Sequence, residues 1–104
     1  MIPIRRVTGA TVDVLQGMLA GSEPVWGLKI IKETDRLPGT VYPILERLES
    51  QGWVTSSWEV DEARSGPRRR YYALTPAGRA AATETCRAYR RRLVAPIRGQ
   101  AVMS

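Results

Sequence analysis

The sequence predicts a mainly α-helical fold with a small β-hairpin, of the α+β class. The spacing of apolar residues changes along the chain in the order helix, short strand, helix, helix, hairpin, helix. The 104 residues suffice for one domain and are too few for two ordinary ones. Apolar residues make up 43% and charged residues 25% of the chain, which is a globular composition and not a disordered one.

Two helices are predicted before residue 38. The first covers residues 9–20, where apolar residues recur at helical spacing: Val12, Leu15, Met18 and Leu19. Residues 21–24 then break the pattern, and residues 25–26 form a short apolar strand. The second helix follows Gly27, and we expect its inward face to carry Leu28 and Ile31, with Ile30 beside them. Residues 37–39 end it, because proline disfavours helical geometry in the preceding residue.

A third helix is predicted to begin near Thr40, whose side chain can cap it. Its apolar stripe consists of Val41, Ile44, Leu45 and Leu48. Pro43 then falls within the first four residues, where backbone N–H groups have no partner inside the helix, so this proline costs no hydrogen bond. Gln51-Gly52 supplies the end of the helix.

The rest of the chain predicts a hairpin and a final helix. In residues 53–60 and 69–74, successive side chains alternate between two faces, which predicts strands. The polar residues 61–67 form the loop between them. Thr75 caps the last helix with Pro76 in its first position, and Pro96 stops it at about Ala95. The whole order is that of a winged helix-turn-helix at residues 8–76, followed by a C-terminal dimerisation helix and tail at 77–104.

Composition excludes several classes of protein. The chain has no His and a single Cys, Cys86, so His-based catalytic triads, His-ligated metals, zinc fingers and an intramolecular disulfide are excluded. The carboxylate clusters lack a base or a glycine-rich phosphate loop, and we therefore expect no enzyme and no cofactor. No apolar run approaches the ~18 residues of a membrane helix, and no signal peptide is visible, so we expect a cytoplasmic protein.

Basic residues are concentrated in the second part of the chain. Residues 1–63 carry 6 basic and 9 acidic side chains, net −3, whereas residues 64–104 carry 10 basic and 1 acidic, net +9. Such a block indicates a polyanionic partner, nucleic acid first and an anionic membrane surface second. The alternative is a solvated surface in a genome that favours Arg codons, since 14 of the 16 basic residues are Arg.

The start of the third helix is the candidate for reading the major groove, which requires polar or small side chains there. The candidate DNA-binding residues on this helix are Thr40, Tyr42, Pro43 and Arg47. The tyrosine and threonine hydroxyls can bond to phosphates. The opposing interpretation is that Tyr42 is half-buried core, packed on Trp53 or Trp26.

The arginines around the hairpin tip are the second candidate contact. Arg64, Arg68 and Arg69 flank Gly66-Pro67, and such arginines can follow the phosphate backbone or enter the minor groove. Arg69 and Arg70 point to opposite sides of a strand, so at most one of them faces DNA while the other covers the sheet or pairs with Glu59.

The last helix carries a seam of residues spaced by four, three and four, as in a helix that packs against another helix: Ala82, Cys86, Tyr89 and Leu93. The seam packs either on its own domain or on the same helix of a second subunit. We favour the dimer, because the first three helices and the hairpin can close a small core without it. Cys86 is then a packing residue, with a redox switch as the minority alternative. Arg90, Arg91 and Arg92 form a solvated face or a further phosphate contact.

Three blocks of the chain resemble the PadR-like family of transcriptional regulators. They are residues 26–31 (Trp-Gly-Leu-Lys-Ile-Ile), residues 38–54 with their Pro-Gly-Thr-Val-Tyr-Pro start, and residues 66–78 with Arg-Tyr-Tyr-Ala-Leu-Thr-Pro-Ala-Gly. By their positions in these blocks, the resemblance implies that DNA is contacted by Thr40, Tyr42 and Pro43, and it places Arg68 in the wing. Trp26 stands where His is common, and the C-terminal part is shorter than in members with ligand pockets.

The resemblance implies a homodimeric, sequence-specific DNA-binding regulator, usually a repressor, on a palindromic double-stranded operator. It also implies a small aromatic or drug-like effector. Two alternatives remain from charge alone: a non-specific or architectural nucleic-acid-binding protein, and a basic module that docks on an acidic protein.

Overall fold

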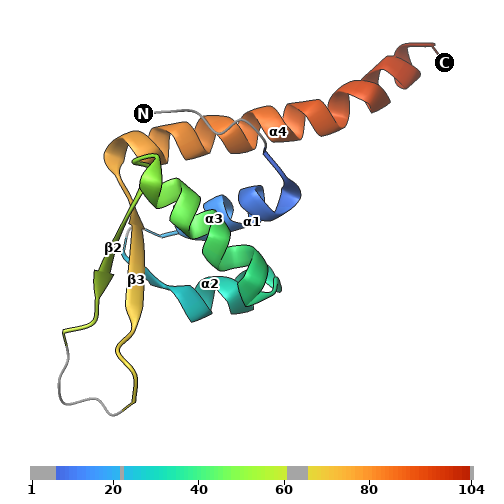
Figure 1. Ribbon diagram of the computed structural model, residues 1–104. Coiled ribbons are helices and arrows are strands. Elements are labelled where there is room, and N and C mark those ends of the chain that lie inside the picture. Colours follow the sequence, from blue (N-terminus) through green and yellow to red (C-terminus); the bar gives the residue numbers. More distant parts are fainter. Residues whose placement is uncertain (1–6, 22, 61–65, 104) are drawn as a thin grey trace.

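The computed structural model describes residues 7–21, 23–60 and 66–103, with side chains described up to Leu93. The elements are, in order, α1 (Gly9–Leu19), β1 (Val25–Trp26), α2 (Gly27–Thr34), α3 (Pro38–Ser50), β2 (Val54–Trp58), β3 (Arg70–Leu74) and α4 (Pro76–Met103). The predicted winged helix-turn-helix is confirmed: α2 and α3 form the turn unit, and the β2–β3 hairpin extends away from it (Figure 1).

The sheet has three antiparallel strands in the order β1-β3-β2. The hairpin register pairs Val54 with Leu74 and Trp58 with Arg70. The sequence predicted the short strand at residues 25–26 but not its partner, which is β3, with Val25 opposite Tyr72. This pairing fixes the start of α2 against the root of the wing.

The second and third helices differ from prediction at their starts. In α2 it is Ile30 that is buried, while Leu28 is 41% exposed. Helix α3 begins at Pro38, two residues before Thr40, and Thr40 does not cap it: Leu37 is the N-cap, without a side-chain bond. Proline suits the first helical position because its missing N–H has no partner there. Pro43 consequently lies beyond the first turn and does cost a backbone hydrogen bond.

Helix α4 completes the core, which corrects the expectation that the core closes without it. Ala82 and Cys86 are 0% and 2% exposed within the single chain, in one cluster with the apolar side of α1. These two residues are therefore not available to a second subunit. Tyr89 is half-buried beside the same cluster, whereas Leu93 is 58% exposed.

The beginning of α4 follows the prediction and its end does not. The Thr75 hydroxyl accepts a hydrogen bond of 2.8 Å from the Gly78 amide, which is the predicted cap. The helix runs through Pro96 to Met103, so the predicted stop at Ala95 is wrong. A proline removes one backbone bond, and helical turns on either side can carry the helix past it. In Figure 1, α4 extends well beyond α1–α3.

Gly78 is required by the contact between α4 and the start of the hairpin. A Cβ atom at this position would overlap the carbonyl group of Trp53, which is backbone and cannot rotate away. The same Trp53 carbonyl accepts a hydrogen bond of 2.9 Å from the Thr75 amide. Any side chain at residue 78 must therefore separate two segments that are bonded to each other.

We predict that Gly78→Ala destabilises the protein by about 3 kcal/mol, because overpacking against fixed backbone forces a shift of α4. The matched control is Gly17→Ala in α1, where nothing lies within 4 Å of the added atom. That change should stabilise the helix by about 0.5–1 kcal/mol. Urea denaturation followed by circular dichroism measures both, and equal stabilities would contradict this account of the contact.

Candidate nucleic-acid interface

The exposed side of α3 carries the residues predicted to face DNA. Pro43 and Arg47 are exposed and Thr40 is half-buried, while the other side of the helix buries the stripe of Val41, Ile44, Leu45 and Leu48. The helix is thus held by its apolar face and presents its first two turns outward. This is the arrangement that a recognition helix needs to enter a groove.

Tyr42 both packs and remains partly exposed. Its ring lies against the start of α2: a Cβ atom at Gly27 would be 3.0 Å from Tyr42 Cε1 and 3.1 Å from its hydroxyl oxygen. The packing alternative is therefore correct in part, with Gly27 as the partner. The half-buried Tyr42 side chain leaves part of its surface accessible, so packing does not exclude a bond to a phosphate.

Arg68 is exposed and stabilises the wing. Its Nε and Nη2 atoms donate to the Glu59 carbonyl oxygen at 3.0 and 2.8 Å. The Arg69 amide donates to the Glu59 carboxylate at 3.1 Å, and the Glu59 amide donates to the Arg69 carbonyl at 2.7 Å. These bonds extend the pairing of the hairpin beyond β2 and β3. Arg64, the other wing-tip candidate, lies outside the described residues.

The side chains of Arg69 and Arg70, which follow in the wing, contact different residues. The Arg69 guanidinium lies 4.1 Å from the centre of a Trp26 ring, and among the described residues its side chain has no ion-pair partner. Arg70 donates to the Ser56 hydroxyl at 2.7 Å and lies 3.6 Å from the Glu49 carboxylate. The expected pairing with Glu59 is thus made by the Arg69 backbone and not by its side chain.

A pocket of about 600 Å³ lies between α2, α3 and the wing, and sequence reasoning missed it. Its lining residues come from five elements and the wing loop: Trp26, Leu28, Tyr42, Trp58, Pro67, Arg68, Arg69, Arg70 and Tyr72. We name it the wing pocket. Aromatic residues next to arginines were visible in the sequence, but only the pairing of β1 with β3 brings Trp26 to Arg69.

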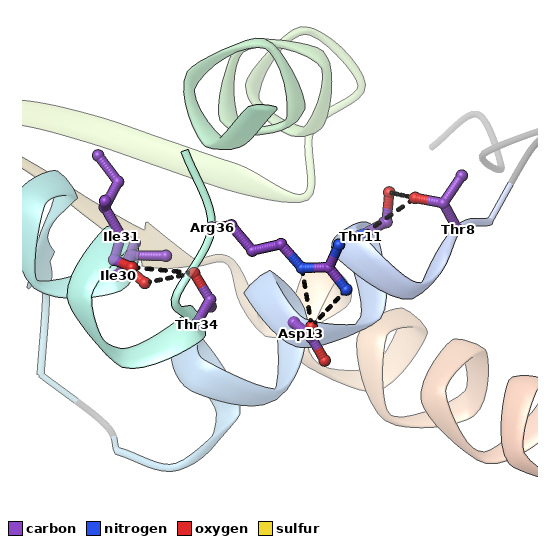
Figure 2. A network of polar contacts seen from close by, with 7 residues as sticks. All are labelled: Thr8, Thr11, Asp13, Ile30, Ile31, Thr34 and Arg36. Atoms are coloured by element: carbon purple, nitrogen blue, oxygen red, sulfur yellow. Dashed lines mark hydrogen bonds and ion pairs between the residues drawn. The ribbon is translucent and has the colours of Figure 1, made fainter. Parts of the chain in front are cut away.

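The turn between α2 and α3 is tied to α1 by an ion pair. Both Nε and Nη2 of Arg36 donate to one carboxylate oxygen of Asp13, at 3.1 and 2.9 Å (Figure 2). Asp35, just before it, has a φ of 56°, the left-handed geometry that ends α2. Figure 2 also shows the Thr34 hydroxyl, which donates to the Ile30 carbonyl at 2.8 Å. The direction in which α3 leaves the turn is thereby set by α1.

Burial raises the pKa of two side chains. One is the Cys86 thiol, which is 2% exposed in the core cluster, as expected for a packing residue. The other is the Tyr72 hydroxyl, whose pKa burial raises against the opposing effect of the Arg70 charge.

Four arginines of α4 lie on its exposed side: Arg87, Arg90, Arg91 and Arg92. Arg91 and Arg87 reach the Glu84 carboxylate at 3.1 and 3.5 Å, and Arg92 lies 5.7 Å from the centre of the Tyr89 ring. Glu84 therefore offsets part of this charge. In the part of the chain that the structure describes, no helix is both long and apolar enough to cross a membrane.

Comparison with known proteins gives the same fold. The transcriptional regulator PadR-like family matches residues 15–84 of this chain. The transcriptional regulator Rv3488 of Mycobacterium tuberculosis is 53% identical over 51 residues, which are 49% of this chain and 45% of that protein, so the match spans less than half of the relative.

Two solved structures are also similar. A PadR-like transcription factor from Bacteroides fragilis is 26% identical, with a TM-score of 0.65 and 86% of each chain covered. A putative DNA-binding protein from Ralstonia eutropha JMP134 is 25% identical, with a TM-score of 0.60, 77% of this chain and 98% of that chain covered.

Proposed function

Because the chain belongs to the PadR-like family of transcriptional regulators, we propose that it is a homodimeric repressor of a palindromic DNA operator. Helix α3 of each subunit enters a major groove, and the wing follows the adjacent backbone. The observation that carries the proposal is the exposed start of α3 beside an arginine-bearing wing. The family consists of regulators and not of enzymes.

The geometry supports two kinds of contact with DNA. Arg47 and the Thr40 and Tyr42 hydroxyls lie on the exposed or half-exposed side of α3, within reach of base edges and phosphates. Arg68 is exposed at the root of the wing loop, where its charge can meet a phosphate. Such a protein represses when its dimer covers promoter DNA and excludes other proteins from the same grooves.

The proposed dimer uses the part of α4 that leaves the core. Ala82 and Cys86 are already buried, so the second subunit would meet the helix from Leu93 onward, where α4 extends past α1–α3 (Figure 1). Two copies joined there would place their α3 helices on successive turns of the duplex, ~34 Å apart.

The net charge of +9 at residues 64–104 also favours a second candidate, a non-specific DNA-binding protein. Titration of the protein against its own promoter fragment and against unrelated DNA separates the two. A specific regulator should prefer its own site by ~10³-fold or more, with a log affinity that falls linearly with log salt. Equal affinity for the two DNAs would establish the second candidate instead, and no dependence on salt would exclude both.

Tyr42→Phe tests the recognition helix without removing its packing. The ring that covers Gly27 is retained and only the hydroxyl is lost, so stability should be unchanged while specific affinity falls about tenfold. The matched control is Tyr71→Phe in β3, away from α3 and the wing pocket. Fluorescence anisotropy of a labelled operator gives the affinities, and equal effects of the two substitutions would count against contact by Tyr42.

Leu93→Asp tests the dimer. A charge at this position should convert the dimer to a monomer and abolish binding to a full palindrome, while a half-site is still bound weakly. The control is Val60→Asp, because Val60 is another apolar residue with an exposed side chain (85% exposed) and this change should leave the mass unchanged. Sedimentation equilibrium measures the mass of each variant. A dimer that persists in Leu93→Asp would exclude this helix segment as the interface.

A further inference from the structure

Leu37, directly before α3, is a large apolar residue that is 75% exposed. Of the other large apolar residues with exposed side chains, Leu28 and Trp58 line the wing pocket, and Leu93 lies on α4 where the dimer is proposed. A single exposed leucine on a protein surface is ordinary. The position of Leu37 and what it costs the helix therefore decide whether it has a role.

Leu37 occupies the N-cap position of α3, which leucine serves poorly. Its carbonyl accepts hydrogen bonds from the Thr40 and Val41 amides at 2.9 and 3.0 Å, but its side chain makes no capping bond. Serine, threonine, aspartate and asparagine are preferred here, because their side-chain oxygens accept from the first free amides of the helix. Leucine gives up that bond and also leaves apolar surface in water. A partner outside the chain would offset the second cost.

The backbone that carries Leu37 is held on both sides. Before it, Arg36 donates to one carboxylate oxygen of Asp13, which ties the turn to α1 (Figure 2). After it, the first amides of α3 bond to the Leu37 carbonyl. The Leu37 side chain is thus presented from a fixed backbone, and no segment has to be ordered when it meets a partner.

The surface around Leu37 is uncharged. Residues 37–45 contain no acidic or basic side chain, and the exposed residues among them are Leu37, Pro38, Gly39 and Pro43. The first residues of a recognition helix are those that reach base edges. In the major groove the C5-methyl group of thymine is the apolar group that bases present, and apolar side chains contact it. An apolar, uncharged helix start suits this methyl group better than it suits a phosphate.

We propose that Leu37 is a specificity-determining residue, whose side chain covers the methyl group of one thymine in each half-site of the operator. The contact removes apolar surface of both groups from water, and a G·C pair at the same place offers no methyl group. The inference rests on the proposed function, because α3 must enter the major groove of a preferred site. Phosphate contacts hold the protein on DNA, whereas this contact selects a base.

The preferred site is obtained by enrichment of a random duplex library on the full chain. Each thymine of the enriched half-site is then replaced by deoxyuridine in both half-sites. Deoxyuridine pairs as thymidine does and lacks only the C5-methyl group. We expect one position at which the exchange weakens binding at least about tenfold, since one buried methyl-sized group accounts for about fourfold in each half-site. Fluorescence anisotropy of the labelled duplexes measures the affinities.

Variants of Leu37 on the same duplexes assign the effect to this side chain. Leu37→Ser removes the apolar contact and supplies a capping oxygen, so it should bind the thymine and uracil duplexes equally and unfold at a higher urea concentration than the wild type. Leu37→Met retains an apolar side chain and should keep the preference for thymine. Gain of stability with loss of methyl dependence is the result that a purely structural role would not produce.

Three results would overturn the inference. An equal loss on the uracil duplex in Leu37→Ser and in the wild type would mean that another residue covers the methyl group. Lower stability of Leu37→Ser would show that the leucine packs within its own chain. An enriched site whose affinity does not change at any thymine position would refute the role of Leu37 and leave the proposed function intact, whereas a library without enrichment would refute both.

Discussion

The contact between Trp53 and the start of α4 joins the two elements that we propose bind DNA, α3 and the wing, to the last helix. The Trp53 amide donates to the Leu48 carbonyl at 2.9 Å, which joins the residue to the end of α3, and its own carbonyl accepts from Thr75 at 2.9 Å. Gly78 lies directly against that carbonyl. Helix α3, both strands of the wing and α4 therefore meet within a few residues. A displacement at this junction changes the angle between α3 and the wing, which in the proposed function contact one DNA surface together.

Most of the fold could be predicted from the sequence because its signals are local. The Thr75-Pro76 start of α4 and the apolar stripe of α3 depend on neighbours a few residues away, and both are observed as predicted. The capping preference of threonine predicts the start of α3 near Thr40, but Pro38 occupies the first helical position, so the helix begins two residues earlier.

What was missed depends on tertiary contacts. The seam of α4 has the same spacing whether it packs on α1 or on a second subunit, so periodicity alone could not place Ala82 and Cys86. The candidate site could also be predicted only where it depends on local sequence. The exposed face of α3 follows from its apolar stripe, whereas the wing pocket requires the β1–β3 pairing to bring Trp26 to Arg69.

The fold also reduces the number of positive charges that are available to bind phosphates. Of the arginines in residues 64–104, Arg91 lies beside Glu84, whose charge is already included in the net +9, and Arg70 lies beside Glu49, which lies outside the segment and offsets one further positive charge. Arg79 donates at 2.7 Å to the Gly21 carbonyl, so it serves the end of α1. Fewer cations are thus available to phosphates than the +9 of this segment implies. Non-specific affinity for DNA grows with the number of neutralised phosphates, so these internal partners limit it. In the proposed complex, shape and hydrogen bonding at α3 therefore gain relative weight in the choice of a DNA site.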